Sequence, residues 1–166
     1  MDFEIRTTVL EDKDTVSDLL LKSYTALLAG AYDAVTLKQA LPLITRAQKD
    51  LLTSGTYYAA ATRDGTIIGV GGWTRHSPTG KYETSTNGNI RHFGTDPDFA
   101  GRGVGRALMT RCIEDARSAG VSEFNCYSTL NGEAFYRACG FTSIEPCPIF
   151  LPGNVTFPSI RMTRPL

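Results

Sequence analysis

The sequence lacks an excess of charge of either sign, since 17 lysines and arginines balance 17 aspartates and glutamates. It also contains no basic arm and no block of like charges. Nucleic acids and anionic membrane surfaces attract proteins through such basic clusters, so the composition offers no electrostatic basis for either partner. Nor does any apolar run approach the roughly 18 residues that a membrane-spanning helix requires. We therefore expect neither a nucleic-acid-binding protein nor a membrane protein.

A signal peptide is absent from the first residues, which read Met1-Asp2-Phe3-Glu4, and this predicts a cytoplasmic protein. Cysteines spaced as in C-x-x-C motifs are missing too, although the chain has four: Cys112, Cys126, Cys139 and Cys147. In a reducing compartment such cysteines are small apolar side chains, and we expect no metal site. A catalytic cysteine is disfavoured because only two histidines could serve as its base.

The size and apolar content of the chain are those of a globular domain. Its 166 residues are 42% hydrophobic, enough to bury a sizeable core. No internal repeat and no shift in composition divides the chain. We therefore expect a single domain over residues 1–166.

The first 55 residues show mainly helical patterns. Residues 3–6 alternate between apolar and polar and predict a strand. A capping box that begins at Thr8 predicts a helix, which Gly30 ends. Residues 31–54 predict further helix, with Pro42 at the start of its clearest part.

The period then changes to two, which predicts strands. Residues 56–62 and 67–73 form two strands around an Asp-Gly hairpin turn, and residues 89–95 form a third. Residues 75–88 predict a long polar loop, and long loops in compact domains are often functional.

The rest of the chain continues the alternation of helix and strand. A helix from Val104 to Gly120 and a strand at 121–129 complete a βαβ unit with the strand at 89–95, so these two strands should be parallel. The remaining segments predict a short helix at 132–139, a strand at 141–144, a long loop at 145–158 and a final strand at 159–163.

The stretch Gly101-Arg102-Gly103-Val104-Gly105-Arg106 leads directly into this amphipathic helix. A glycine turn there leaves backbone N–H groups pointing outward, which favours an anion, usually a phosphate. Arg102 and Arg106 stand where the helix dipole disfavours a cation, as expected if a negative ligand lies between them. A tight turn without a ligand is the alternative. A P-loop is disfavoured because no Gly-Lys-Ser/Thr ends the stretch.

Four segments in this order resemble the GNAT superfamily of acyl-CoA-dependent N-acyltransferases. They are Ile5-Arg6-Thr7-Thr8 with Glu11-Asp12, the Asp-Gly hairpin, Thr95-Asp96-Pro97 through Gly105, and Ala134-Phe135-Tyr136-Arg137-Ala138-Cys139-Gly140-Phe141. The third is similar to the family's cofactor loop, Gln/Arg-x-x-Gly-x-Gly/Ala, and the fourth to its Phe-Tyr-x-x-x-Gly-Phe segment. The resemblance implies a mixed α+β or α/β fold. Its twisted sheet is mostly antiparallel, with a splayed parallel pair at the centre and helices on both faces.

The resemblance also implies that acetyl-CoA is the acyl-donor cosubstrate. The glycine loop would hold its diphosphate, and its pantetheine arm would lie in the gap between the strands at 89–95 and 121–129. Ala100 falls where the family usually has Gln or Arg, so only its backbone can contribute. A backbone N–H of the first strand could stabilise the oxyanion. The cofactor-binding residues implied are Phe93, Gly94, Thr95, Ala100, Gly101, Arg102, Gly103, Val104, Gly105, Arg106 and Asn131.

Tyr136 takes the place of the tyrosine often assigned as general acid in this family. With an ordinary pKa near 10 it is protonated at pH 7 and can donate to the departing thiolate. The alternative is an aromatic side chain packed under a short helix. The general base stays open between His92, His76, Glu83, a water chain and an amine that is already neutral.

The resemblance implies transfer of an acetyl group to a primary amine of a small molecule or a protein by direct attack. The alternative is a non-catalytic acyl-CoA-binding sensor of the same fold. Acceptor specificity should come from the loops at 28–40, 75–88 and 145–158. Trp73, Tyr82 and Phe150 are candidate pocket residues, and ordinary core or rim packing is the favoured alternative for all three. Many relatives dimerise, so a homodimer stays open.

Overall fold

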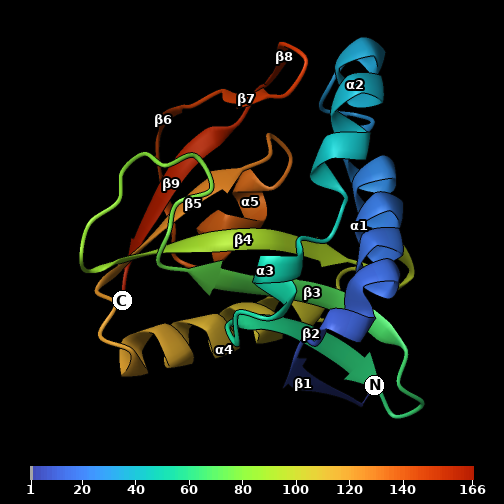
Figure 1. Cartoon of the computed structure of the whole chain (residues 1–166), viewed down its shortest axis with the longest axis vertical. Helices are drawn as coiled ribbons and strands as arrows, with labels where there is room; N and C mark the ends of the chain where they lie inside the picture. The colour runs from blue at the N-terminus through green and yellow to red at the C-terminus, as the bar shows by residue number, and fades with distance from the viewer. Residues whose placement is uncertain (1) are drawn as a thin grey trace.

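A seven-stranded sheet forms the centre of the computed structural model, which describes residues 2–166 (Figure 1). Its strand order is β1-β2-β3-β4-β5-β9-β6, and every neighbouring pair is antiparallel except β4 and β5. The strands of this sheet are β1 Phe3–Thr7, β2 Tyr57–Thr62, β3 Ile67–Thr74, β4 Asn87–Thr95, β5 Glu123–Ser128, β6 Thr142–Pro146 and β9 Ile160–Pro165. The expected mixed sheet with a central parallel pair is confirmed.

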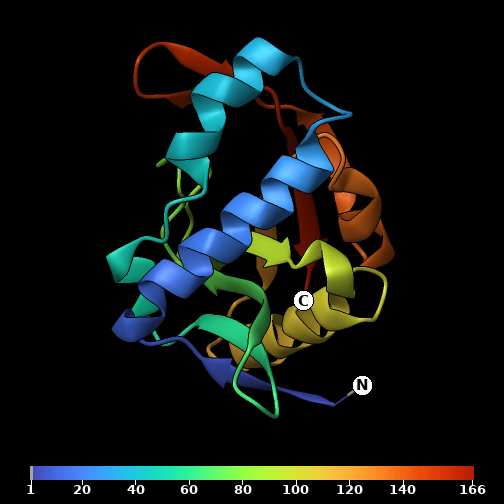
Figure 2. The same cartoon turned by 90° about the vertical axis from the view of Figure 1, so that its right-hand side faces the viewer.

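Helices cover both faces of the sheet, as expected (Figure 2). The α-helices are α1 Lys13–Leu28, α2 Ala34–Ile44, α3 Lys49–Leu52, α4 Val104–Ser118 and α5 Glu133–Ala138, with 3-10 turns η1 Leu10–Asp12 and η2 Pro97–Phe99. Alternate residues of β2 point to opposite faces, so Tyr57 packs with α1 and α3 whereas Tyr58 packs with α4. No helix within residues 2–166 is both long and apolar enough to span a membrane.

The start of α1 differs from the capping box expected at Thr8. The Thr8 hydroxyl instead donates to the backbone carbonyls of Leu52 and Tyr57, at 2.9 and 3.1 Å. Asp12 instead caps the 3-10 turn η1 that precedes α1, because its carboxylate accepts the N–H of Val9 at 2.9 Å. The expectation failed because Thr8 is buried between β2 and α3, where its hydroxyl finds stronger partners than the helix end.

The expected helix start at Pro42 is also wrong, since Pro42 lies inside α2. That helix begins after Asp33, whose carboxylate accepts the N–H of Thr36 at 2.8 Å. A proline in a helix removes one backbone donor, and α2 ends two residues later at Ile44.

The segment predicted as a loop at 145–158 contains a two-stranded hairpin, β7 Ile149–Leu151 and β8 Val155–Phe157. Its turn has positive φ at Gly153 and Asn154, residue types typical of tight hairpin turns. The hairpin packs against α2 and the end of α1, where Phe157 stacks on Tyr32 with ring centroids 4.5 Å apart. The hairpin therefore closes one end of the molecule beside α2 (Figure 1).

The parallel strands β4 and β5 stay paired only at their beginning. Their register ends at Asn89 opposite Asn125, and beyond this point the strands separate. A bulge in β4 sets His92 and Phe93 opposite Gly71 of β3, and His92 has a φ of +43°. A Cβ on Gly71 would come within 2.7 Å of the Phe93 ring, so only glycine fits there. The bulge bends β4 away from β5 and opens the sheet.

Candidate active site

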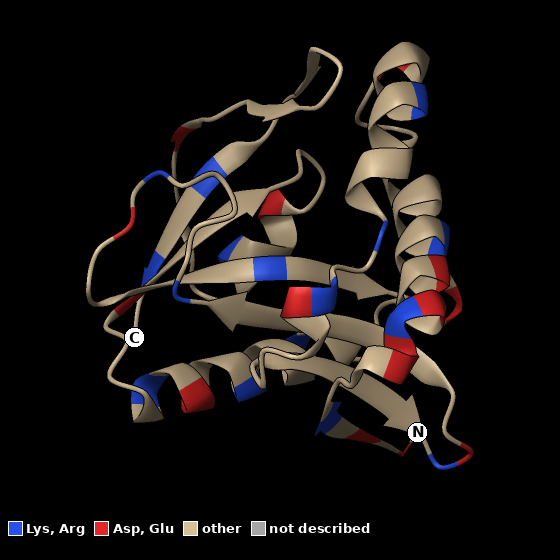
Figure 3. Ribbon diagram, viewed as in Figure 1, with Lys and Arg blue, Asp and Glu red and all other residues tan. Residues whose placement is uncertain are grey.

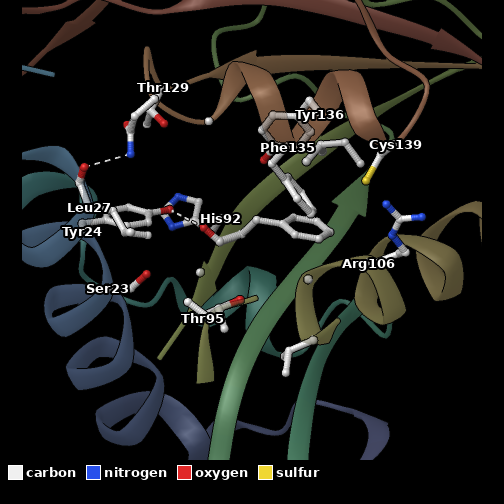
Figure 4. Close-up of a pocket in the computed structure, with 18 of the residues that line it drawn as sticks. Ser23, Tyr24, Leu27, His92, Thr95, Arg106, Thr129, Phe135, Tyr136 and Cys139 are labelled. Carbon is white, nitrogen blue, oxygen red and sulfur yellow. Dashed lines mark hydrogen bonds between the residues drawn. The ribbon is translucent and has the colours of Figure 1, made fainter. Parts of the chain in front are cut away.

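A cleft of about 510 Å³ lies where β4 and β5 part (Figure 4). Its walls come from α1, β4, β5, the segment between η2 and α4, and α5. Of the site residues expected from the sequence, those that line it are Phe93, Gly94, Thr95, Ala100, Gly101, Gly103, Val104, Gly105, Arg106, Asn131 and Tyr136. Arg102 is the one expected residue that does not line it.

The β4 wall presents an open backbone edge toward the cleft. Residues 90–95 have no strand partner on the β5 side within residues 2–166. Two tyrosines hold the bulged backbone: Tyr57 donates to the carbonyl of His92 at 2.9 Å and Tyr24 to that of Phe93 at 3.0 Å. Burial raises the pKa of both tyrosines, so they remain donors. The bulge is thus a rigid wall for an extended ligand.

The opposite end of the cleft is the N-terminus of α4, a helix of 15 residues. Gly101 and Gly103 have φ of +75° and +83°, which turns the chain into the helix. Within residues 2–166 no acceptor is found for the first N–H groups of the helix, those of Val104, Gly105 and Arg106. The first turn also has no acidic residue. These features together make the anion-binding geometry that the sequence predicted.

The two arginines of this loop have different surroundings. Arg106 lines the cleft beside Cys139 (Figure 4). The guanidinium of Arg102 lies 5.5 Å above the Phe99 ring, outside the cleft lining. Nearby, Lys22 of α1 pairs with Asp96 and Asp98 at 2.8 Å each. Lys22 therefore offsets two carboxylates that would repel an anion at the loop.

We expect Arg106→Gln to weaken coenzyme A binding about tenfold, which corresponds to about 1.4 kcal/mol. Arg102→Gln should weaken it less than about threefold, because Arg102 stacks on Phe99 outside the cleft. Calorimetric titration at low and high salt measures both effects, and the difference should shrink at high salt. Equal affinity of Arg106→Gln and the unaltered protein would show that the backbone alone holds the phosphates.

Tyr136 lies within α5, and its ring contacts three other aromatic rings. Its ring meets those of Phe93, Phe135 and Phe141 edge-on, with centroids 6.3, 5.1 and 5.5 Å apart. Burial, followed by the neighbouring Cys126, raises the pKa of Tyr136 well above its ordinary value. The phenol is therefore protonated at physiological pH and lines the cleft as a donor. Tyr136 is thus packed among aromatic side chains, as one alternative expected, and it also lines the cleft.

Of the side chains considered as general base, only His92 lines the cleft. Burial, and then the charge of Arg91, lower its pKa to about 4, so the ring is neutral at pH 7 but a weak base. His76 and Glu83 lie 3.8 Å apart in the loop between β3 and β4, away from the cleft lining. No aspartate or glutamate lines the cleft. The base stays open between His92, a water chain and a neutral amine.

The lowered pKa of His92 predicts a pH-dependent stability. Between pH 6.5 and about 4 the unfolded chain binds a proton at this position and the folded chain does not, so stability falls as the pH drops through this window. His92→Asn, which tolerates the positive φ, should flatten this fall by up to roughly 1.4 kcal/mol per pH unit. Urea unfolding at pH 4.5 to 7 measures it, with the exposed His76→Asn as control. Equal slopes for all three proteins would contradict the prediction.

Ser23 of α1 was not expected at the site. Its side chain is completely buried, its Oγ has no partner within residues 2–166, and it lines the cleft (Figure 4). Such an orphan hydroxyl costs free energy unless a ligand satisfies it. The Oγ would lie 3.6 Å from a Cβ on Gly94, beside the β4 wall. The Ser23 hydroxyl therefore lies behind the β4 wall as a buried polar group without a partner within residues 2–166.

Two further residues named from the sequence are Asn131, which lines the cleft, and Trp73, which does not. Asn131 is exposed, and its amide donates to the Leu27 carbonyl at 2.9 Å, which ties the start of α5 to α1. A cofactor contact by Asn131 stays a prediction. Trp73 does not line the cleft; it is buried in the core beside Phe124, with ring centroids 6.1 Å apart. This is the core packing that was the alternative to a pocket role, and Trp73 has it because it points to the α4 face of the sheet.

An open cleft between two splayed parallel strands, leading to an uncapped helix N-terminus, defines a protein that binds an extended ligand with an anionic end. The model of the acetyltransferase (GNAT) family matches residues 16–141, and the chain belongs to this family. Acetyl-CoA is the acyl donor of the family.

Two curated proteins illustrate the similarity. The N-alpha-acetyltransferase RimI of Mycobacterium tuberculosis is 30% identical over 99 residues, 58% of this chain and 58% of that protein. The aminoglycoside N(6')-acetyltransferase type 1 of Stenotrophomonas maltophilia is 32% identical over 95 residues, 55% of this chain and 62% of that protein. The chain thus spans less than two thirds of each of these relatives.

Among solved structures, the PaiA N-acetyltransferase of Thermoplasma acidophilum in complex with coenzyme A aligns with a TM-score of 0.75. The alignment covers 100% of both chains at 18% sequence identity. At this identity the likeness establishes the fold.

Proposed function

We propose that the chain is an acetyltransferase that moves the acetyl group of acetyl-CoA to a primary amine. The observation that carries the proposal is one continuous cleft. It runs from the free N–H groups of α4, along the unpaired edge of β4, to the buried and protonated Tyr136. A diphosphate at one end and a thioester at the other match these two ends in chemistry.

In the proposed reaction, the neutral amine nitrogen attacks the thioester carbonyl and the carbon–sulfur bond breaks. The thiolate takes the phenolic proton of Tyr136, the amine loses its extra proton to His92 or to water, and a proton then returns from there or from solvent to the Tyr136 phenolate, which restores the enzyme. A backbone N–H of the bulge at Phe93 or Gly94 stabilises the oxyanion.

The acceptor is either a small-molecule amine or a protein amine. The names of the relatives cover both, since one is an N-alpha-acetyltransferase and another an aminoglycoside acetyltransferase. A non-catalytic acyl-CoA sensor of the same fold is the competing function. It would use the same cleft and the same loop, but it would not need a protonated tyrosine at the reactive end.

Calorimetric titration with acetyl-CoA, coenzyme A and ATP tests the ligand, and release of free thiol in the presence of an amine panel tests the activity. We expect binding of acetyl-CoA and coenzyme A, weaker or no binding of ATP, and amine-dependent thiol release. Tight acetyl-CoA binding without thiol release for any amine would favour the sensor. Binding of ATP but not of acetyl-CoA would overturn the assignment.

A further inference from the structure

Arg91 is a charged side chain that does not line the cleft and has no role in the proposed reaction. It is the one charged residue of β4, which shows blue but no red in Figure 3. Its two terminal nitrogens donate to uncharged groups, the hydroxyl of Thr74 and the side-chain carbonyl of Gln48, each at 3.1 Å. Its Nε has no acceptor within residues 2–166. Burial lowers the pKa of Arg91, yet a guanidinium stays charged at neutral pH.

A half-buried guanidinium without a carboxylate partner is unfavourable by itself. No salt bridge within residues 2–166 includes Arg91. By contrast, Arg161 of β9 lies 3.4 Å from Glu145 and covers the Tyr82 ring at 4.2 Å. The charge of Arg91 therefore lacks a counter-ion that a comparably placed arginine has.

Arg91 is adjacent in the chain to a residue of the cleft wall. It directly precedes His92, which lines the cleft, and its charge contributes to the lowered pKa of His92. It lies on the side of the sheet where the end of β3 and the segment before α3 meet β4, as its contacts with Thr74 and Gln48 show. An acceptor that entered the cleft past His92 from this side would meet a positive charge.

Within residues 2–166 the cleft has no acidic side chain that could pair with a polycation. Its charged lining residue is Arg106, its titratable imidazole is neutral, and no aspartate or glutamate lines it. An acceptor with several ammonium groups would be repelled at both ends. A nearby positive charge also lowers the pKa of an approaching amine, which favours the neutral, nucleophilic form where no carboxylate base is present.

We infer that the acceptor is an amine that also carries an anionic group, a carboxylate or a phosphate, which pairs with Arg91. This inference rests on the proposed function and names its substrate class. The anion supplies the missing counter-ion of Arg91, while the amino group points toward the thioester beside Tyr136. Arg91 then determines specificity by pairing with the acceptor and not by touching the acyl donor.

Matched amines test the inference by thiol release with acetyl-CoA. The pairs are α-amino acids against their α-carboxamides and O-phosphoethanolamine against ethanolamine, with spermidine as the polycation. We expect at least one anionic amine to exceed its neutral partner about tenfold or more in kcat/KM, and spermidine to be the poorest. A preference for carboxylate or for phosphate distinguishes the two anions. Equal or better use of the neutral amines or of spermidine overturns the inference while leaving the acetyltransferase function intact.

Variants separate recognition from a purely structural role. Arg91→Gln should raise KM for the anionic amine about tenfold or more, leave acetyl-CoA affinity unchanged, and change kcat/KM for the neutral partner much less than for the anionic amine. Arg91→Lys should retain part of the preference, since the charge remains. Arg63→Gln, which alters an exposed arginine paired with Asp2, is the control. An equal loss for all amines in Arg91→Gln would mean that Arg91 only supports β4.

A binding measurement keeps the test independent of turnover. N-acetyl amino acids and their amides, as product mimics, are titrated onto the protein saturated with coenzyme A. We expect the acids to bind more tightly than the amides, and the difference to vanish in Arg91→Gln. Equal affinity of the unaltered protein for the acids and for the amides overturns the inference. Failure to bind coenzyme A at all overturns the proposed function instead.

Discussion

Tyr136→Phe should lower kcat for amine acetylation about tenfold to a hundredfold and leave acetyl-CoA affinity within about twofold. The loss is below the largest general-acid effects because a thiol with a pKa near 8.5 leaves fairly well as a thiolate. Phenylalanine keeps the three aromatic contacts of Tyr136, so the cleft should keep its shape. Steady-state kinetics of thiol release and calorimetry with acetyl-CoA measure the two quantities.

Tyr58→Phe is the matched control. Tyr58 is also buried, but its hydroxyl bonds to Asp115 of α4, away from the cleft lining. Because burial keeps the pKa of Tyr136 well above its ordinary value, Tyr136 should cause no basic limb in the pH profile of kcat up to pH 9. An unchanged kcat in Tyr136→Phe would leave Tyr136 with a packing role.

Gly105→Val should weaken acetyl-CoA binding at least about tenfold, or about 1.4 kcal/mol. A Cβ at Gly105 would lie 3.1 Å from the Phe135 ring, already closer than ordinary contact. The two further methyl groups of valine must therefore turn toward the cleft or displace α5. Either change closes the space in front of the free N–H groups of α4.

The same substitution at Gly30, where a Cβ meets nothing within 4 Å, is the control. Circular dichroism and the unfolding midpoint verify that both variants fold. Should Gly105→Val bind acetyl-CoA as tightly as Gly30→Val, the start of α4 would not be the phosphate site.

Local sequence patterns were sufficient to predict most elements and the two ends of the cleft. The glycine turn and the amphipathic run after it predict the start of α4, because both are signals within a few residues of each other. The order of strands around the Asp-Gly hairpin is local in the same sense. The hairpin β7–β8 was missed because its strands are only three residues long, although Gly153-Asn154 is a turn signal within it.

The assignment of side chains to the two faces of the sheet was beyond local reasoning. Alternation shows that neighbours on a strand point to opposite faces, but not which face carries the cleft. The sequence therefore left Trp73 open between the acceptor pocket and the core, and the structure places it in the core. Ser23, by contrast, was not expected at the cleft, because in the sequence it is only a serine within an apolar helix pattern. Within residues 2–166 its hydroxyl has no partner because α1 crosses β4 beside Gly94.

The sequence by itself determined the family, most of the elements and the glycine turn before α4, because these depend on residues close together in the chain. Tertiary structure alone decided which side chains share the cleft. Three findings depend on how β4, α1 and the loops pack. They are the separation of Arg102 from Arg106, the unpartnered hydroxyl of Ser23 and the unpaired charge of Arg91. Packing decides such matters because a charge or hydroxyl is satisfied only by atoms within hydrogen-bond distance, and those atoms come from distant parts of the chain.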